Sequence, residues 1–363
     1  MKVLSLFDGI SCAAVALERL KIPIEAYYTS EIDPYAIRIS RYNFPGIIRL
    51  GDVKNVHGTT ESWVNNARDG HLLKGVGKDF DIGIDLLIGG SPCQDLSIAK
   101  KNRKGLAGER SGLFYEFVRI LKEVKPTYFI LENVASMSEE SKATISMELG
   151  VHPIMINASL VSGQNRKRLF WTNVPNFRMP EDKGIMLKDV LLDGETEDLK
   201  SLCITATYHK KNARDFLKKG SGQMIRIGNI GTDAQAHRVY SPEGKSVALS
   251  ALGGGQGAKT GLYLVQRPRG KNKGGEHHEK SPTVTSSSFE HNNHVSDGYT
   301  LRKLHPIECE RLQGLPENYT ELGINDAGMI AKISNSRRYQ VIGNAFNVDV
   351  VAHILSFIKH EYV

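Results

Sequence analysis

The chain has 363 residues, of which 40% are hydrophobic, and its 47 lysines and arginines exceed its 40 aspartates and glutamates to give a net charge of +7. This length can bury a full core in two domains, and the positive charge suits a polyanion such as nucleic acid. Four widely spaced cysteines exclude a disulfide framework and fit a reducing compartment. No apolar run approaches about 18 residues and no signal peptide is recognisable, so we expect a soluble, cytoplasmic protein.

The first 175 residues alternate short apolar strands with amphipathic helices. A strand is predicted at residues 3–7, followed after Asp8 and Gly9 by a helix that Pro23 stops. Another helix is predicted at residues 113–124. This βαβα order predicts an α/β domain with a doubly wound, mostly parallel sheet over residues 1–175.

The character of the sequence changes at about residue 176. Between 176 and 300 Gly, Ser, Asn, His and Lys dominate and the apolar runs are short, which predicts a smaller, irregular, β-rich domain. Helical patterning returns at 301. The last predicted helix, at residues 347–358, has an apolar stripe, so we expect residues 301–363 to pack back on the first domain.

A cysteine stands where a nucleophile belongs. The apolar run at 84–88 predicts a buried strand, which Gly89, Gly90 and Pro92 break, so that Cys93 falls on a turn at its carboxyl end. In open α/β sheets that edge is where ligands bind. A free cysteine is more often a small buried hydrophobe, but two later segments favour a site.

An acid and two arginines follow other predicted strands. The strand at 127–131 ends in Glu132, and a third strand at 164–168 is predicted to place Gln164, Arg166 and Arg168 on one face. These residue types at successive strand ends indicate a site rather than a core.

The loop after the first strand is predicted to hold a cofactor. The turn from Phe7 to Ser11 offers backbone N–H groups to a polar or anionic ligand. It lacks the three glycines of a dinucleotide fingerprint, which argues against NAD. Glu31 ends the next strand where an acid binds ribose hydroxyls, and Asp52, after a third strand, could accept from an adenine amino group.

Taken together, these residues resemble the cytosine-5 DNA methyltransferase family over nearly the whole chain. Its motifs occur in the family's order: the nucleophile motif at residues 91–94, the acid motif at 132–134, the arginine motif at 164–168, the helix-and-turn motif at 302–319 and the last cofactor motif at Gly343 and Asn344. The nucleophile motif is also similar to that of the animal de novo methyltransferases. One departure is Ser11, where many members carry a second glycine.

The resemblance implies a Rossmann-like methyltransferase domain that uses S-adenosylmethionine. Attack of the Cys93 thiolate on C6 of cytosine would make C5 nucleophilic enough to take the methyl group. Glu132 would share a proton with N3, Arg168 would pair with O2, and Arg166 would favour the thiolate. The base must be flipped out of the duplex, and residues 95–112 suit a closing loop. A water chain and a side chain remain alternatives for the base that removes the C5 proton.

The same resemblance assigns contact residues. Cofactor contacts fall on Phe7, Gly9, Ile10, Glu31, Ile32, Asp52, Val53, Pro92, Leu113 and Asn344. DNA contacts fall on Gln94, Ser97, Arg110, Gln164, Gln235, Arg238, Gly254 and Gly255. The expected partner is double-stranded DNA, bound by a monomer without an obligate protein partner, in a bacterium or a phage-infected cell.

The segment between Ile225 and Gly261 resembles the target-reading region of bacterial methyltransferases that modify GCGC. In that group the residues matching Gln235 and Arg238 touch guanines, which arginine reads well. The chain departs at Ala248, where a hydroxyl residue is usual, and in the insert at 266–298, which leaves the outer bases of the site open. The histidines of this insert are expected to face solvent or phosphate rather than zinc, because no cysteines accompany them.

Three other classes of protein remain as alternatives. A tRNA cytosine-5 methyltransferase would share the fold and mechanism, but those relatives have a shorter recognition region and a Cys-Phe-Thr signature absent here. A catalytically inactive DNA-binding regulator is disfavoured because Cys93, Glu132, Arg166 and Arg168 are all present. An NAD-dependent oxidoreductase lacks support without the glycine fingerprint.

Overall fold

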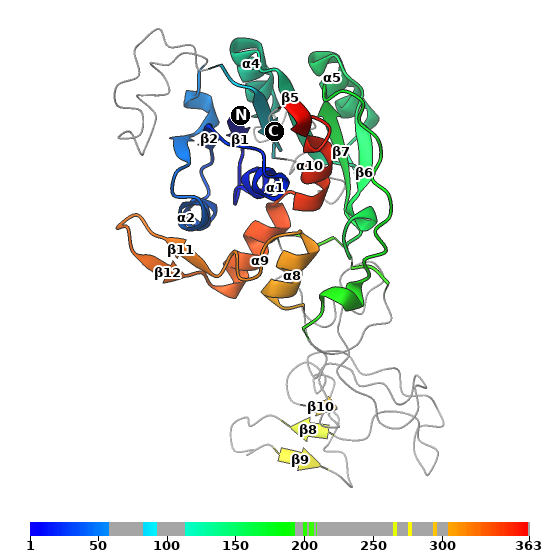
Figure 1. Ribbon diagram of the computed structural model, residues 1–363. Coiled ribbons are helices and arrows are strands. Elements are labelled where there is room, and N and C mark those ends of the chain that lie inside the picture. Colours follow the sequence, from blue (N-terminus) through cyan, green and yellow to red (C-terminus); the bar gives the residue numbers. More distant parts are fainter. Residues whose placement is uncertain are drawn as a thin grey trace.

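A seven-stranded sheet forms the centre of the computed structural model, in the order β3-β2-β1-β4-β5-β7-β6 (Figure 1). The structure describes residues 1–57, 83–92, 113–192, 199–201, 203–206, 208 and 304–361, with the backbone of three short strands between 264 and 295. The seven strands are β1 Lys2–Leu6, β2 Ala26–Ser30, β3 Ile48–Gly51, β4 Leu86–Gly89, β5 Tyr128–Val134, β6 Ile154–Asn157 and β7 Lys167–Thr172. All pairs among β1 to β5 are parallel. The expected doubly wound, mostly parallel α/β sheet is therefore confirmed.

Helices cover both faces of this sheet (Figure 1). They are α1 Cys12–Leu20, α2 Pro34–Asn43, α4 Phe114–Val124, α5 Glu139–Leu149, α8 Pro306–Leu312, α9 Asn335–Asn344 and α10 Val348–Leu355. Alternate strand residues enter separate cores: Val3 and Ile88 pack with α1 and α10, whereas Leu4 and Leu87 pack with α4 and α5. The period of two along each strand thus builds three layers.

The strand expected at residues 164–168 was wrong in its bounds. β7 begins at Lys167, where the buried run Leu169 to Trp171 follows, and it is antiparallel to β5 and β6. Gln164 forms only an isolated bridge with Ser201. The antiparallel direction has a consequence for the site, because the start of β7 meets the end of β5, with Arg168 opposite Val134.

The C-terminal segment returns to the first domain as predicted. The expected helix forms as α10, and Val350, Val351, Ile354 and Ile358 are all buried. It lies against α1 (Figure 1). Arg19 of α1 forms an ion pair with Asp349 at 2.6 Å.

The two ends of the segment 209–303 meet at one place. The backbone N–H of Leu304 donates to the Tyr208 hydroxyl at 3.0 Å, and the Tyr339 hydroxyl donates to the carbonyl of Leu304. The rings of Tyr208 and Tyr339 are 5.3 Å apart. Within that segment β8 Leu264–Gln266, β9 Gly275–His277 and β10 Asn293–Val295 form an antiparallel sheet, and β11 Leu322–Ile324 pairs with β12 Ile330–Lys332 after it.

Two features are absent from the described residues, a membrane-spanning helix and a cluster of metal ligands. No helix among them is long and apolar enough to cross a membrane. No group of three or more histidine, cysteine or acidic side chains among them is placed to hold a metal ion. The domain boundary expected at 176 stays a prediction. Beyond it, Leu187 and Val190 of η6 (Leu187–Val190) pack in the core of the first domain.

Candidate active site

The loop after β1 has a backbone that few side chains tolerate. Phe7, Gly9 and Ser11 all have positive φ angles, of 56°, 60° and 62°. This left-handed geometry turns the chain sharply between β1 and α1. The N–H of Gly9 then donates to Oε2 of Glu31 at 2.7 Å, which joins the ends of β1 and β2.

Glu31 is anchored but not saturated. Its Oε1 accepts from the N–H groups of Ile32 and Asp33 at 2.7 and 2.8 Å. Burial raises the pKa of Glu31, and the hydrogen bonds from Asp33, Gly9 and Ile32 oppose that effect. A carboxylate has about four acceptor sites, so three backbone donors leave capacity for a ribose hydroxyl.

The surroundings of Glu31 also fit a nucleoside. Ile32 is 66% exposed, an unusual position for a large apolar side chain and one suited to an adenine ring. Asp52 follows the adjacent strand β3 and caps η1 (Val53–Asn55) through Lys54 N–H. A side chain at Gly9 would meet no atom within 4 Å, so open space lies over the loop. These residues fit S-adenosylmethionine.

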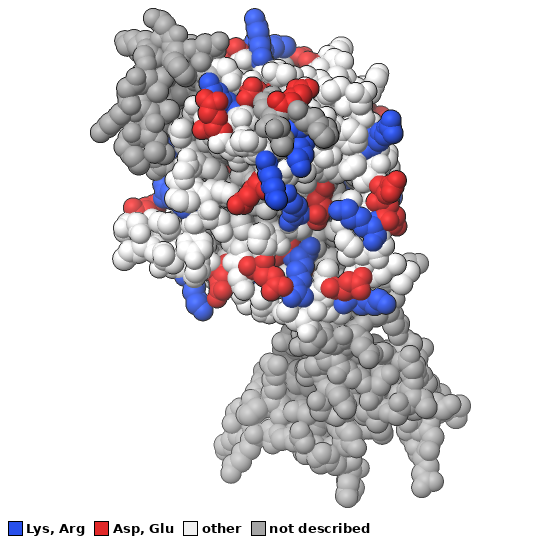
Figure 2. Space-filling model, viewed as in Figure 1, with Lys and Arg blue, Asp and Glu red and all other residues white. Residues whose placement is uncertain are grey.

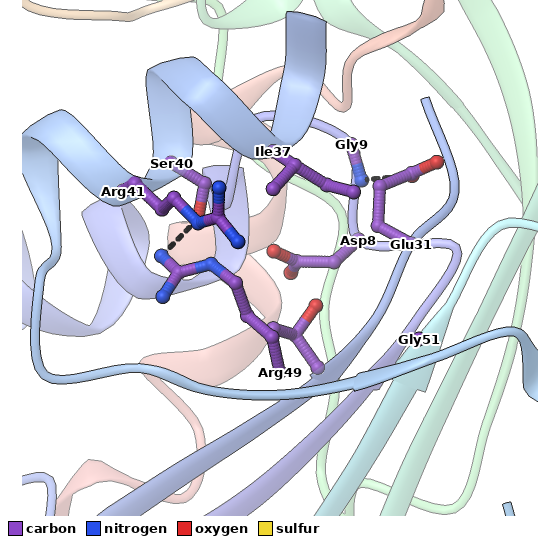
Figure 3. A pocket seen from close by; sticks show the side chains of 9 residues that line it. Asp8, Gly9, Glu31, Ile37, Ser40, Arg41, Arg49 and Gly51 are labelled. Atoms are coloured by element: carbon purple, nitrogen blue, oxygen red, sulfur yellow. Dashed lines mark hydrogen bonds between the residues drawn. The ribbon is translucent and has the colours of Figure 1, made fainter. Parts of the chain in front are cut away.

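A small cavity lies next to this loop (Figure 3). Asp8 lines it and is buried, accepting from the hydroxyls of Ser11 at 2.5 Å and Tyr27 at 2.9 Å. Burial raises the pKa of Asp8, although these hydroxyls partly offset it. Across the cavity Arg49 donates to Ser40 at 3.1 Å. Asp8 thus supports the loop from beneath rather than facing a ligand.

The turn after β4 lies directly against the acid of β5. Asn133 donates to Oγ and to the carbonyl of Ser91, at 3.1 and 3.3 Å. A Cβ at Gly90 would lie 3.3 Å from Oε2 of Glu132 and 2.6 Å from Cε1 of Phe346. Only a glycine allows the chain to lie this close to Glu132 and Phe346 without a shift of these neighbours. The close packing fixes the position of the chain at Gly90, three residues before Cys93.

Glu132 forms an ion pair across the sheet. Nε of Arg168 lies 2.8 Å from Oε1 of Glu132, and both side chains are largely covered, at 17% and 14% exposed. They line one pocket together with Arg166, Phe170 and Phe346. The structure therefore brings the predicted acid and both predicted arginines to one place.

Both terminal nitrogens of the Arg166 guanidinium donate to atoms of the protein. Its Nη1 donates to Sγ of Cys203 at 3.3 Å and to the carbonyl of Ile204, and its Nη2 donates to the carbonyls of Gly343 and Ala345. Burial lowers the pKa of Arg166, to which the charge of Arg168 adds. Arg166 therefore joins three segments of the chain, and its expected effect on the Cys93 thiol stays a prediction because Cys93 lies outside the described residues.

Cys203 lies between the two arginines. Nη2 of Arg168 is 3.9 Å from its sulfur. Burial alone would raise the pKa of Cys203, but the positive charges of Arg166 and Arg168 outweigh it and lower the pKa. Sequence reasoning missed this cysteine because no strand or motif of the first domain contains it.

The remaining predicted residues divide into three groups. Leu113 and Pro92 are partly buried at the ends of α4 and β4, and Asn344 is exposed at the end of α9. The side chains of Ile10 and Val53 are buried, at 1% and 3% exposed, so any cofactor contact would come from their backbone. Outside the described residues lie Cys93, Gln94, Ser97, Arg110, Gln235, Arg238, Gly254 and Gly255.

Gln164, to which the resemblance assigns a DNA contact, is fully buried in this structure. Neither amide atom of its side chain has a hydrogen-bond partner. The DNA contact of Gln164 stays a prediction.

Charges on the catalytic part are mixed. Figure 2 shows basic and acidic side chains interspersed on the face in view. Several form pairs, among them Arg311 with Glu317 at 2.6 Å. No extended basic stripe is visible on the described part of this face.

The model of the C-5 cytosine-specific DNA methylases matches residues 1–360. The chain belongs to this family. It is 29% identical over 378 aligned residues to the type II methyltransferase M.HhaI of Haemophilus parahaemolyticus, covering 98% of this chain and 93% of that one. It is 26% identical to the orphan methyltransferase M.SPBetaI of Bacillus phage SPbeta, covering 100% and 98%.

A solved structure has the same fold. The Entamoeba histolytica methyltransferase EhMeth superimposes with a TM-score of 0.58 at 14% identity, covering 99% of this chain and 98% of that one. This C-5 cytosine methylase is thus a DNA cytosine-5 methyltransferase, and its family and fold imply S-adenosylmethionine as methyl donor and DNA as substrate.

Proposed function

We propose that the enzyme methylates C5 of a flipped-out cytosine within a short GC-containing site in double-stranded DNA, through a covalent bond between Cys93 and C6. The observation that carries this proposal is the contact between the β4 turn and the β5–β7 pair. Ser91, two residues before Cys93, is held by Asn133, and a Cβ at Gly90 would lie 3.3 Å from the carboxylate of Glu132, which pairs with Arg168.

The pocket suits charge that moves from sulfur into a pyrimidine. Attack of the Cys93 thiolate forms the S–C6 bond and pushes an electron pair toward N3 and O2. Glu132 would hold a proton at N3, and Arg168, its ion-pair partner, would receive the charge on O2. C5, now an enamine carbon, takes the methyl group that S-adenosylmethionine supplies. Loss of the C5 proton returns the electron pair to the ring and expels the Cys93 thiolate.

Binding of the cofactor is proposed at the carboxyl ends of β1, β2 and β3. Glu31 would accept from the ribose, Ile32 would pack on the adenine, and Asp52 would accept from its amino group. The Phe7 and Gly9 backbone, with Pro92, Leu113 and Asn344, completes the proposed groove. This edge is adjacent to the β4 turn because β1 pairs with β4 as well as β2.

Sequence readout is proposed for the segment 209–303, nearly all of which lies in the recognition domain proposed at 176–300. This segment contains sixteen lysines and arginines against seven aspartates and glutamates, so it carries more than the whole net charge of the chain. Such an excess supports phosphate binding there. The likeness of Gln235 and Arg238 to guanine-reading residues favours GCGC, with a GCNGC-like site next.

Two experiments test the proposal. Bisulfite sequencing of DNA from cells that express the chain should show modified cytosines within GC dinucleotides, and modification mainly elsewhere would refute the recognition claim alone. A duplex with 5-fluorocytosine should trap the wild type covalently when S-adenosylmethionine is present. Cys93→Ser should bind DNA without trapping or methyl transfer, whereas trapping by Cys93→Ala would exclude Cys93 as nucleophile. Methylation of tRNA but not duplex DNA would favour the other substrate class.

A further inference from the structure

A chain of contacts from Glu132 to Arg166 includes Cys203, a residue to which the proposed mechanism gives no role. Glu132 pairs with Nε of Arg168, Nη2 of Arg168 reaches Sγ of Cys203, and the same sulfur accepts from Nη1 of Arg166. Cys203 is therefore the group between the two guanidinium ions.

We propose that Cys203 is a positioning residue for methyl transfer: its sulfur bridges the two guanidinium groups and thereby holds Arg168 in its pair with Glu132. This inference rests on the proposed function, because it assigns a task to Arg168 during the reaction. The sulfur itself has no contact with the base or the cofactor in this assignment.

The charges around the sulfur explain why a cysteine suits this position. Two cations, Arg166 and Arg168, face one carboxylate, Glu132, which is already paired with Arg168. Every other partner of the Arg166 Nη atoms is a neutral carbonyl. A thiolate at Cys203 balances the second cation, and the lowered pKa of Cys203 agrees with that charge. In its protonated form the thiol would instead donate to the carbonyl of Ile204, 3.6 Å away.

The bridge also limits where Arg168 can move. Arg166 is immobilised by carbonyls from two other segments, so a sulfur attached to it is a fixed point. Arg168, by contrast, is 17% exposed and lies near the start of β7. Without the sulfur, its guanidinium keeps its contacts with Glu132 and with the Lys167 carbonyl but loses the contact of Nη2 with Cys203.

The charge on Cys203 can be measured without any activity assay. In a Cys93→Ser background the remaining cysteines are Cys12, Cys203 and Cys309, and Cys12 and Cys309 are buried with pKa values raised by that burial. Iodoacetamide should therefore modify Cys203 first, as checked by mass spectrometry. We expect the rate to rise at a pH below the ordinary thiol pKa of about 8.5, and Arg168→Gln to move that point upward. A Cys203 that titrates at or above the ordinary value overturns the proposal.

The positioning role is tested by single-turnover methylation. Cys203→Ala should lower the rate by roughly tenfold, the effect of losing one charged hydrogen bond, while S-adenosylmethionine affinity stays unchanged. Cys203→Asp, which restores a negative charge, should recover part of the rate. Because the thiolate exists only above the pKa of Cys203, the advantage of wild type over Cys203→Ala should shrink as the pH falls through it.

A structural role alone would not move these readouts. The matched control is Cys309→Ser in α8, which exchanges a cysteine at 0% exposure and should lower thermal stability while leaving the rate and its pH profile as in the wild type. A constant ratio between wild type and Cys203→Ala across pH would overturn the positioning role and leave the proposed function intact. An inactive wild type with a shifted Cys203 titration would instead refute the proposed function, and the positioning role with it.

Discussion

A single methyl group at Gly90 tests the geometry of the active site most directly. In Gly90→Ala the new Cβ would lie 2.6 Å from Cε1 and 3.1 Å from Cζ of Phe346, and 3.3 Å from Oε2 of Glu132. Carbon atoms in normal contact are about 3.5–4.0 Å apart, so the ring edge must move by roughly 1 Å. Phe346 is only 8% exposed and cannot swing into solvent.

The expected cost follows from this overlap. Overpacking of a filled site costs about 1–3 kcal/mol, and we expect Gly90→Ala to lose stability in that range by denaturant unfolding. The loss of rate should be larger, because a displacement of about 1 Å at a reacting group can cost around a hundredfold. Single-turnover methylation measures it.

Two variants make this prediction specific. Gly46→Ala is the matched control, because a Cβ there meets no atom within 4 Å and should change neither stability nor rate. Phe346→Leu should make room for the Gly90 methyl, so the double variant should be less damaged than the sum of its parts. Gly90→Ala with the rate and stability of Gly46→Ala would refute the contact between the β4 turn and the pocket.

Three further predictions concern other parts of the molecule. Glu132→Gln should lower the single-turnover rate by orders of magnitude at unchanged cofactor affinity, whereas Glu31→Ala or Asp52→Ala should weaken cofactor binding first, as calorimetry would show; near-wild-type turnover of Glu132→Gln would contradict its role. Gly343→Ala places a methyl 2.2 Å from backbone atoms of Thr205 and Ala206, which cannot rotate away, so equilibrium unfolding should show a loss of about 3 kcal/mol or more; an unchanged midpoint would contradict this close approach. Arg238→Ala should relax the preference at one guanine by about 1–3 kcal/mol. Lys271→Ala or Lys273→Ala should instead weaken binding to every sequence and flatten its salt dependence. If all three variants weakened binding to every DNA sequence equally, readout by Arg238 would be ruled out.

The elements that sequence predicted well are those with a strong local period. The α10 helix and the apolar strand β1 were expected at nearly their observed bounds. The β7 strand was misplaced because the prediction followed the polar motif at residues 164–168. In the structure the buried apolar residues Leu169 to Trp171 form the centre of the strand and pair with β5. Its antiparallel direction comes from its pairing with β5 and with β6, the strand that precedes it in the chain and that was not predicted.

The site divides in the same way. Glu31 follows β2, Glu132 lies near the end of β5 and Arg168 lies near the start of the antiparallel β7, so the topology brings them to one edge of the sheet. The hydrogen bonds of Arg166 could not be predicted, because the carbonyls that accept them belong to residues 204, 343 and 345, far along the chain. For the same reason no pattern marked Cys203 as the neighbour of both arginines.

The joint of Tyr208, Leu304 and Tyr339 has a consequence for how such an enzyme can change its target. Because Leu304 is hydrogen-bonded to Tyr208 and to Tyr339, the 95 residues between 208 and 304 leave and re-enter the catalytic body at a single point. An exchanged segment need only bring its two ends together there, and the entropic penalty of closing a longer loop grows slowly, by about 0.6 kcal/mol for each doubling of length. The segment proposed to recognise DNA could therefore be exchanged as a unit without any change to the proposed catalytic residues.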